Sequence, residues 1–399
     1  MGDVGVDFQF SQEENDFRKL VIDFIDNNIP KDLLWKESDS MSDANWPKVI
    51  EVRQKLAKAG LAIIHWPSKY GGQDGTQTFQ LILREEMSQR GVPDSISFDD
   101  GFNFIGPSII DYGSDYLKET HLPGVSNGNV FWCQGYTEPG GGSDLGSSRT
   151  TAVLQGDEYI INGQKDYIFG AARADWIHIL ARTNREESGH RGLSYFLVDM
   201  KSPGITLRAL DEIHGRSSVL NEVFFDDLRV PVRNMLGSPE QGWQIAMDTL
   251  NRERSGIEVV GKTRGLFVEL VDYIRVDYSN LSTDMDIGEV KLKLGEMSAE
   301  IEACRIMAYR VAWLQDHGFD SGYQASMSRL LAIEMWRNFT YLALRILGHY
   351  GNLSGGIESP LEGKLSRGYI ESIAESIYLG TPEIHRNIIA KRGIGLSDE

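Results

Sequence analysis

One segment of the chain has the spacing of a phosphate-binding loop. Gly256 to Thr263 reads GIEVVGKT, which satisfies the pattern G-x-x-x-x-G-K-[ST] of nucleotide hydrolases. Such a loop binds phosphate through backbone N–H groups and must lie between a buried strand and the start of a helix. Apolar residues instead recur at helical spacing from Trp243 through Val260 to Ile274. We therefore predict that one helix runs through this segment and that the protein is not an NTPase.

A second segment, WCQGYTEPGGGSD from Trp132 to Asp144, is rich in glycine and in side chains that form hydrogen bonds. Taken alone, a run such as EPGGGSD indicates only a loop. It is not the G-x-G-x-x-G fingerprint of dinucleotide-binding domains, because Leu145 stands where the third glycine is required. A Rossmann domain is therefore not expected.

Two carboxylate positions could take part in proton transfer. Glu253 follows Leu250 by three residues and precedes Ile257 by four, which puts its carboxyl at the edge of the apolar stripe of its helix. Burial beside apolar groups raises the pKa of a carboxyl and so makes it a better proton acceptor. An ion pair with the adjacent Arg254 is the structural alternative. The second position is the pair Asp99-Asp100, although acids at a helix start also compensate the helix dipole.

Three stretches of different periodicity position these residues. Residues 8 to about 128 are predicted to be helical, beginning with the capping box Ser11-Gln12-Glu13-Glu14 and an apolar face that includes Leu20. From about 129 to 236, short β-branched and aromatic runs alternate with turns, which indicates a compact β domain. Long amphipathic helices are predicted at 241–277, 287–316 and 322–347. The expected domains are therefore 1–128, 129–236 and 237–399.

The bulk composition excludes several classes of protein. The chain has 399 residues, of which 41% are hydrophobic and 25% charged, as in ordinary globular proteins. A net charge of -18 argues against nucleic acid or an anionic membrane as a partner. Cys133 and Cys304 form neither a metal-binding spacing nor a disulfide framework. No basic leader or membrane-spanning run is present, so we expect a cytoplasmic protein with no metal site.

The order of the motifs resembles the acyl-CoA dehydrogenase family over nearly the whole chain. The matching elements are the capped first helix, TEPGGGSD, Gly156-Asp157-Glu158-Tyr159, Asn162-Gly163-Gln164-Lys165, Asn221-Glu222-Val223-Phe224-Phe225, Val230-Pro231, Gly242-Trp243 and TPEIHRNII from Thr381 to Ile389. The resemblance implies an α+β fold with an N-terminal helical domain, a central β domain and a C-terminal four-helix bundle. It also implies a bound FAD, an acyl-CoA substrate and removal of an α-proton with transfer of the β-hydride to flavin N5.

The resemblance assigns the cofactor contacts to several segments. In the segment after Trp132 they are Gln134, Tyr136, Thr137, Gly142 and Ser143, with Ser143 also reaching the CoA portion. Tyr167, Ile168 and Phe169 correspond to a Trp-Ile-Thr element beside the flavin ring. Because Phe169 lacks the usual hydroxyl, we expect altered flavin tuning or a place in the core for this side chain. The remaining cofactor residues are Arg345, Thr381 and Glu383.

The usual base of the family is missing from this chain. The segment Tyr378-Leu379-Gly380-Thr381 aligns with a Tyr-Glu-Gly-Thr element, so Leu379 stands in place of the catalytic glutamate. In a branch that includes isovaleryl-CoA and bacterial steroid side-chain dehydrogenases, the glutamate of a Glu-Arg pair on the first bundle helix is the base instead. Glu253 matches it, and we predict Glu253 as the base, with Asp99 and Asp100 as the alternatives that similar alicyclic enzymes suggest. The expected substrate-binding residues are Ser143, Asn251, Arg254, Leu379 and Gly380.

The subunit-facing motifs of the family are incomplete here. The segment from Arg275 to Leu281 lacks the Arg-x-x-Phe-Gly motif that reaches the FAD of a neighbouring subunit. We expect a homodimer or tetramer, with a heteromer as the alternative, and an electron-transfer flavoprotein as the acceptor. Three functions stay open at this stage: dehydrogenation of a branched, cyclic or bulky acyl-CoA, an incomplete-site subunit serving a catalytic paralogue, and flavin chemistry on a nitrogen or sulfur compound.

Overall fold

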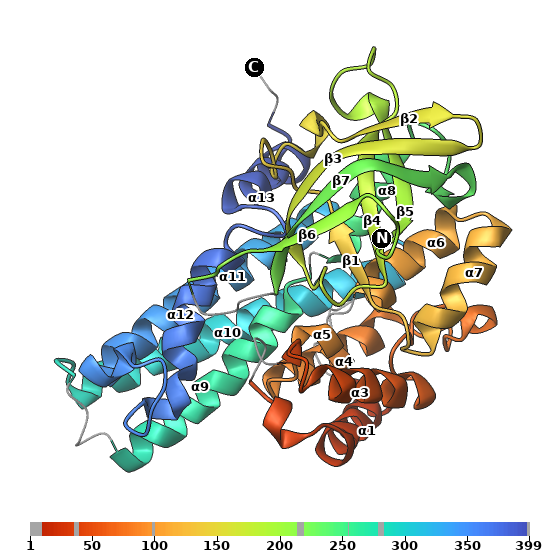
Figure 1. Cartoon of the computed structure of the whole chain (residues 1–399). Helices are drawn as coiled ribbons and strands as arrows, with labels where there is room; N and C mark the ends of the chain where they lie inside the picture. Colours follow the sequence, from red (N-terminus) through yellow and green to blue (C-terminus); the bar gives the residue numbers. More distant parts are fainter. Residues whose placement is uncertain are drawn as a thin grey trace.

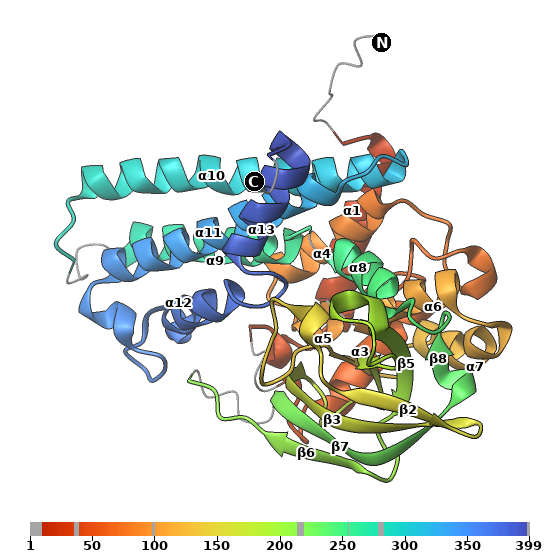
Figure 2. The ribbon, with the colours of Figure 1, turned by 90° about the horizontal axis from the view of Figure 1, so that it is seen from above.

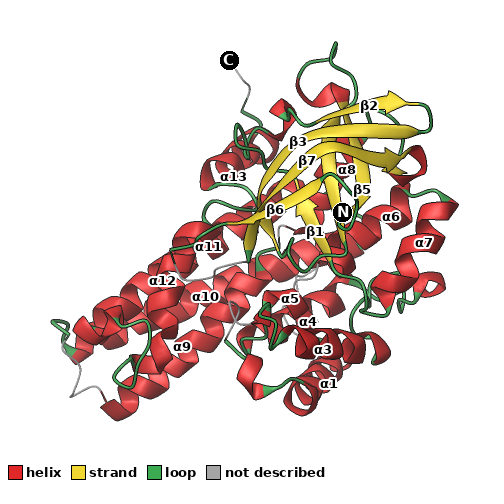
Figure 3. Cartoon of the chain, in the orientation of Figure 1, coloured by secondary structure: helices red, strands yellow, loops and turns green. Residues whose placement is uncertain are grey.

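Helices, a β-sheet and helices again follow one another along the chain (Figure 1). The computed structural model describes residues 10–35, 40–97, 100–213, 219–253, 255–277 and 283–396. The strands gather at one end of the molecule, and the long C-terminal helices extend away from them (Figure 3). The predicted α+β architecture is therefore confirmed.

The N-terminal part consists of short helices around one core. They are α1 (Gln12–Asn28), α3 (Trp46–Lys58), α4 (Gln77–Gln89), α5 (Asp94–Ser97), α6 (Gly106–Tyr112) and α7 (Asp115–Ser126), with a π-helical turn at Gly101–Ile105. The predicted capping box is present, since Ser11 N–H donates to Glu14 Oε2 at 2.6 Å and Glu14 N–H donates to Ser11 Oγ at 3.2 Å. Val21 and Ile25 are buried, whereas Leu20 is 51% exposed, so the predicted apolar face is wrong at that residue.

The central part is one mostly antiparallel sheet. Its strands are β1 (Trp132–Gly135), β2 (Thr151–Gln155), β3 (Glu158–Phe169), β4 (Trp176–Arg182), β5 (Leu193–Asp199), β6 (Ile205–Ala209), β7 (Leu220–Pro231) and β8 (Met235–Leu236). The order is β6-β7-β3-β2-β4-β5-β8, and β1 pairs with β4 in parallel, with Gln134 opposite His178. This pairing brings the predicted flavin segment beside a histidine that is distant in sequence.

The C-terminal helices α9, α10 and α11 lie side by side (Figure 2). The elements of this part are α8 (Gly242–Glu253), α9 (Ile257–Asp277), α10 (Ile287–Asp316), α11 (Gly322–Leu347), α12 (Lys364–Glu375) and α13 (Pro382–Ile388). Helix α8 packs against β5 and its Ile245 belongs to the core of the N-terminal part, whereas α9 belongs to the bundle. The chain therefore passes from one part to the other between α8 and α9.

The prediction of one helix from Trp243 to Ile274 is wrong. Helix α8 ends at Glu253 and α9 begins at Ile257, because Gly256 adopts the left-handed region at φ +75°. The GIEVVGKT segment nevertheless has no strand before it, and from Ile257 onward it is helical. A Cβ on Gly261 would lie 2.8 Å from the Glu85 carbonyl oxygen of α4, so this glycine serves close helix packing.

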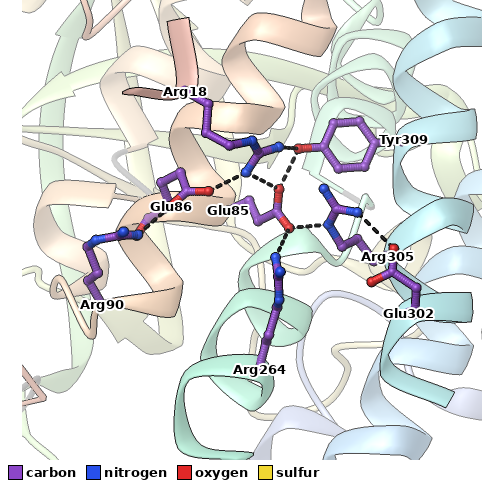
Figure 4. Close-up of polar contacts among 8 residues, drawn as sticks. All are labelled: Arg18, Glu85, Glu86, Arg90, Arg264, Glu302, Arg305 and Tyr309. Atoms are coloured by element: carbon purple, nitrogen blue, oxygen red, sulfur yellow. Dashed lines mark hydrogen bonds and ion pairs between the residues drawn. The ribbon is translucent and has the colours of Figure 1, made fainter. Parts of the chain in front are cut away.

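A buried carboxylate, Glu85 of α4, joins four helices (Figure 4). Glu85 is fully buried and accepts from Arg18 of α1 at 2.9 Å, from Arg264 of α9 at 3.3 Å and from Arg305 of α10. The Tyr309 hydroxyl donates a further bond at 2.5 Å. Burial acts to raise the pKa of Glu85, but the arginines outweigh it and the pKa lies below its usual value. We call these residues the Glu85 cluster; they fix the position of α4 relative to the bundle.

In the part of the chain that the structure describes, we find no helix long and apolar enough to cross a membrane.

Candidate active site

The loop after β1 is held by a buried ion pair that the sequence analysis did not identify. Lys165 Nζ on β3 lies 2.7 Å from Glu138 Oε1, and the Lys165 side chain is fully buried. The same carboxylate accepts from the backbone N–H groups of Arg149 at 2.6 Å and Thr150 at 3.1 Å, and from the Ser148 hydroxyl. Glu138 therefore ties the two ends of the GGGSD turn to β3.

Burial and pairing shift the pKa of both groups in this ion pair. Burial acts to raise the pKa of Glu138, but the Lys165 ammonium and the hydrogen bonds outweigh it and lower the pKa to about 2. Burial in turn lowers the pKa of Lys165, which Glu138 offsets in part. Both residues lie within motifs quoted above, TEPGGGSD and NGQK, yet nothing in the sequence pairs them. Only the sheet brings them together.

The predicted flavin residues near β1 differ in what they can offer a ligand. Gln134 has a buried side-chain nitrogen that donates to no acceptor among the described residues. Thr137 is half-buried, and its carbonyl accepts from Asp166 N–H at 2.9 Å, which sets the loop beside β3. Gly142 and Ser143 are exposed. All four residues are at least partly exposed.

The Tyr136 side chain points into the core instead. Its hydroxyl lies 2.7 Å from the Tyr195 hydroxyl, which lies 2.5 Å from His178 Nδ1. His178 Nε2 is 3.1 Å from Asp100 Oδ2. Only the backbone of Tyr136 is left for a ligand, and Asp100, the alternative base, is engaged by a buried histidine. Asp99, the other alternative, lies outside the described residues.

The three predicted ring-wall residues on β3 separate into different environments. Tyr167 has φ +59° at an irregularity in the pairing of β3 with β7, and its side chain is 65% exposed. Non-glycine residues in this region of φ are uncommon and often mark functional sites. Ile168 is buried in the sheet core. Phe169 packs against the small cluster of Met41, Phe131 and Val219, so it has the place in the core that we gave as its alternative.

The C-terminal segment has an unusual backbone where the family carries its usual base. Leu379 adopts φ +59° and Gly380 φ +98°. Thr381 then caps α13 by accepting from Ile384 N–H at 3.4 Å, which confirms the predicted helix start. Glu383 is exposed, and its own backbone N–H together with the Thr381 hydroxyl lowers its pKa. The Leu379 side chain has no proton acceptor, so at this position only the backbone can take part in a reaction.

The remaining predicted residues lie at the α8–α9 break and on α11. Glu253 is the last residue of α8 and Asn251 is in its final turn, but their side chains lie outside the described residues, as does all of Arg254. The Ser328 hydroxyl of α11 donates to the Ser255 carbonyl at 2.7 Å and so supports the break. Arg345 is in the last turn of α11, partly exposed, 4.0 Å from Asp284.

The groups at the end of β1 fit a flat, hydrogen-bonding ring. The Gln134 side-chain nitrogen, which has no acceptor among the described residues, the half-buried Thr137 and the exposed Tyr167 ring provide polar contacts and an aromatic surface. A flavin has a polar pyrimidine edge and flat faces, so the available groups match its chemistry.

Comparisons with known proteins agree along the chain. Family models match at residues 11–129 (acyl-CoA dehydrogenase, N-terminal domain), 133–228 (acyl-CoA dehydrogenase, middle domain) and 240–394 (acyl-CoA dehydrogenase, C-terminal domain). The chain is 34% identical over 346 residues to acyl-CoA dehydrogenase IpdE1 of Mycobacterium tuberculosis, which covers 87% of both chains.

Two solved structures are also similar to the whole chain. The Tcur3481-Tcur3483 steroid ACAD superposes with a TM-score of 0.87 at 25% identity, covering 99% of this chain and 100% of that one. The ChsE4-ChsE5 complex from Mycobacterium tuberculosis gives a TM-score of 0.84 at 26% identity, with the same coverage. The fold and these matches define a flavoprotein oxidoreductase acting on the CH–CH bond of acyl-CoA thioesters. The chain belongs to the acyl-CoA dehydrogenase family.

Proposed function

We propose that this protein is an FAD-dependent acyl-CoA dehydrogenase for a branched, cyclic or otherwise bulky acyl group, with Glu253 as the base. The observation that carries the proposal is that the usual base position holds a leucine, while a glutamate stands at the position of the base in another branch of the family. Leu379 keeps a left-handed backbone at the usual base position but cannot take a proton. Glu253 is the last residue of α8, which packs on the sheet, and α9 of the bundle begins four residues later. A carboxylate there would sit at the junction where the family binds its flavin.

The protein's own groups can remove the α-proton and bind the thioester carbonyl. We propose that the Glu253 carboxylate takes the α-proton, with its pKa raised by the apolar acyl group around it. The Leu379 backbone N–H, which the substitution leaves in place, would donate to the thioester carbonyl and favour loss of that proton. Ser143, Asn251, Arg254 and Gly380 would position the thioester and CoA. When bound, the flavin supplies the acceptor for the β-hydride.

We propose that several described segments hold the FAD. Gln134, Thr137, Gly142 and Ser143 would contact the ring side, together with Tyr167 and the backbones of Tyr136 and Ile168. Arg345, Thr381 and Glu383 would contact the more distant parts of the cofactor. The unpaired Gln134 nitrogen supports this assignment, because leaving a buried donor unpaired costs about 1–3 kcal/mol. The free, buried thiols of Cys133 and Cys304 agree with a cytoplasmic location.

Replacing Glu253 by glutamine tests the base. Glutamine keeps the shape and removes the proton acceptor, so we expect anaerobic bleaching of the flavin by acyl-CoA to slow by at least about a hundredfold while flavin content is unchanged. Asp100→Asn is the matched comparison at the alternative carboxylate, and we expect it to retain most of the rate. Bleaching at the wild-type rate by Glu253→Gln would exclude this residue as the base.

A heteromeric enzyme is the second candidate, and two observations favour it. The segment after α9 lacks the arginine motif that would reach a neighbour's cofactor, and Arg275 instead lies 3.1 Å from Asp272 of its own helix. The similar ChsE4-ChsE5 structure is named as a complex of two chains. Purifying the chain alone distinguishes the cases: a flavin-loaded homo-oligomer supports the first, and flavin uptake only with a paralogue supports the second. An electron-transfer flavoprotein is the proposed acceptor in both.

A further inference from the structure

A cavity of about 250 Å³ lies beside the π-helical turn Gly101–Ile105, on α4 and near the end of α10. The six residues that line it all have polar side chains: His65, Gln77, Gln80, Arg84, Asn103 and Gln315. Pockets for aliphatic chains are lined mainly by hydrophobic side chains. This lining therefore does not suit an unsubstituted acyl tail, which would desolvate amides without pairing them.

Gln80 indicates which hydrogen-bonding group is missing. The residue is 4% exposed, and its Nε2 donates to Asn103 Oδ1 at 3.2 Å. Its Oε1 is buried and accepts no hydrogen bond from any residue that the structure describes. Such an acceptor costs about 1–3 kcal/mol unless a donor reaches it. A ligand that satisfies Gln80 must therefore bring an O–H or N–H group.

The charge of the cavity favours a neutral donor. Arg84, the cationic group of the lining whose charge does not depend on pH, is ion-paired with Glu258 of α9. Gln77, Gln80, Asn103 and Gln315 carry neutral amides, which both donate and accept. A carboxylate would present only acceptors to Gln80 Oε1, and an ammonium would lie close to the Arg84 guanidinium. A hydroxyl donates one bond and accepts others, so it matches this set.

Two of the lining residues connect the cavity to the segments that contain the candidate bases Asp100 and Glu253. Asn103 lies three residues beyond Asp100, in the turn held by a bond of 2.9 Å from Trp66 Nε1 to the Phe102 carbonyl. On the other side, Arg84 reaches Glu258 in the first turn of α9, just after the break that follows Glu253. The lining residues are therefore joined, through the π-helical turn and through the Arg84–Glu258 pair, to the segments that contain Asp100 and Glu253, and α4 supplies three of them.

We propose that this cavity is the subsite for a hydroxyl group on the far end of the acyl moiety, and that Gln80 is the residue that selects it. The inference rests on the proposed function, because the acyl group must enter from the side of Glu253. The enzyme then acts on a hydroxylated cyclic or branched acyl-CoA in preference to the same skeleton without the hydroxyl.

The test compares matched thioesters on the flavin-loaded protein, with its partner chain if one copurifies. The probes are cyclohexylpropanoyl-CoA and its ring-hydroxylated forms, each position and epimer separately. We expect kcat/KM for flavin reduction to be about tenfold or more higher for one hydroxylated form, as pairing a buried acceptor allows. In Gln80→Leu we expect that preference to vanish while the unsubstituted thioester keeps its rate within about threefold.

Gln89→Leu is the matched control, since Gln89 is on the same helix and does not line the cavity, and its buried Oε1 also accepts no hydrogen bond within the described part of the chain. We expect it to keep the wild-type preference. Gln80→Met, which conserves the volume better, replaces Gln80→Leu if that variant does not fold. Wild-type protein that reduces its flavin with every probe alike would overturn the subsite, as would a Gln80 variant that keeps the preference.

Calorimetric titration of the same thioesters separates this proposal from the function on which it rests. If no thioester bleaches the flavin, the dehydrogenase proposal fails. Tighter binding of a hydroxylated form, lost in Gln80→Leu, would still support the subsite. Equal binding of all probes would mean that the cavity holds only water and would overturn it.

Discussion

Removing the Lys165 ammonium should destabilise the flavin-facing loop. In Lys165→Met, Glu138 stays 8% exposed and keeps three neutral donors, but it loses its countercharge. A pKa lowered from 4.5 to about 2 corresponds to about 3 kcal/mol of stabilisation of the carboxylate, which comes from Lys165 together with the hydrogen bonds of Ser148 and Arg149. Breaking a buried ion pair on one side typically costs about 3–5 kcal/mol. Since burying Lys165 is itself costly, we expect the lower end, about 3 kcal/mol.

The assay is urea unfolding followed by tryptophan fluorescence, with flavin content measured on the same samples. We expect both the midpoint and the bound flavin to fall in Lys165→Met, because Glu138 holds the turn that contains Gly142 and Ser143. Lys201→Met is the matched control. Lys201 is 80% exposed and 3.6 Å from Asp175, so its loss should change the free energy of unfolding by less than about 0.5 kcal/mol.

The double variant Glu138→Gln with Lys165→Met isolates the pair. With both charges removed, we expect it to be more stable than Lys165→Met alone by about 2 kcal/mol, since no buried charge is left without a partner. A change of less than about 1 kcal/mol in Lys165→Met, with flavin content unchanged, would refute the reasoning.

Three further predictions follow from the same structure. Gly265→Ala should destabilise the protein although alanine favours helices, because the added Cβ would lie 2.1 Å from the Gln89 carbonyl oxygen; a higher melting temperature would contradict this. Glu85→Gln should lower the free energy of unfolding by about 3 kcal/mol or more in a denaturant titration, because Arg18, Arg264 and Arg305 lose their shared carboxylate. The control Glu51→Gln removes an exposed pair with Lys55 and should cost less than about 1 kcal/mol. Because the folded pKa of Glu138 is lowered, its stabilisation should be present above pH 4.5 and lost as the pH falls towards 2. In Glu138→Gln, the free energy of unfolding should therefore depend less on pH in that window. Parallel curves of the free energy of unfolding against pH for wild type and variant would show that Glu138 does not titrate there.

Local patterns in the sequence were enough to predict the helical and β stretches of the chain and the family. The capping box at Ser11, the Thr381-Pro382 helix start and the β-branched runs each depend on neighbours within a few residues. The ordered motifs predicted the family, and with it the α+β fold. One local signal was overlooked: Ser255-Gly256 is a turn-forming dipeptide, and it ends α8 where we expected one continuous helix.

The sequence alone determined the order of helical and β stretches along the chain and which loops carry polar groups, because those choices depend on residues close together in the chain. The tertiary structure decided which of those groups meet. Lys165 pairs with Glu138, 27 residues away in the sequence, and Asp100 contacts His178, 78 residues away. The polar cavity likewise joins α4, the π-helical turn and α10. Contacts of this kind depend on sheet order and helix packing, to which no short pattern in the sequence corresponds.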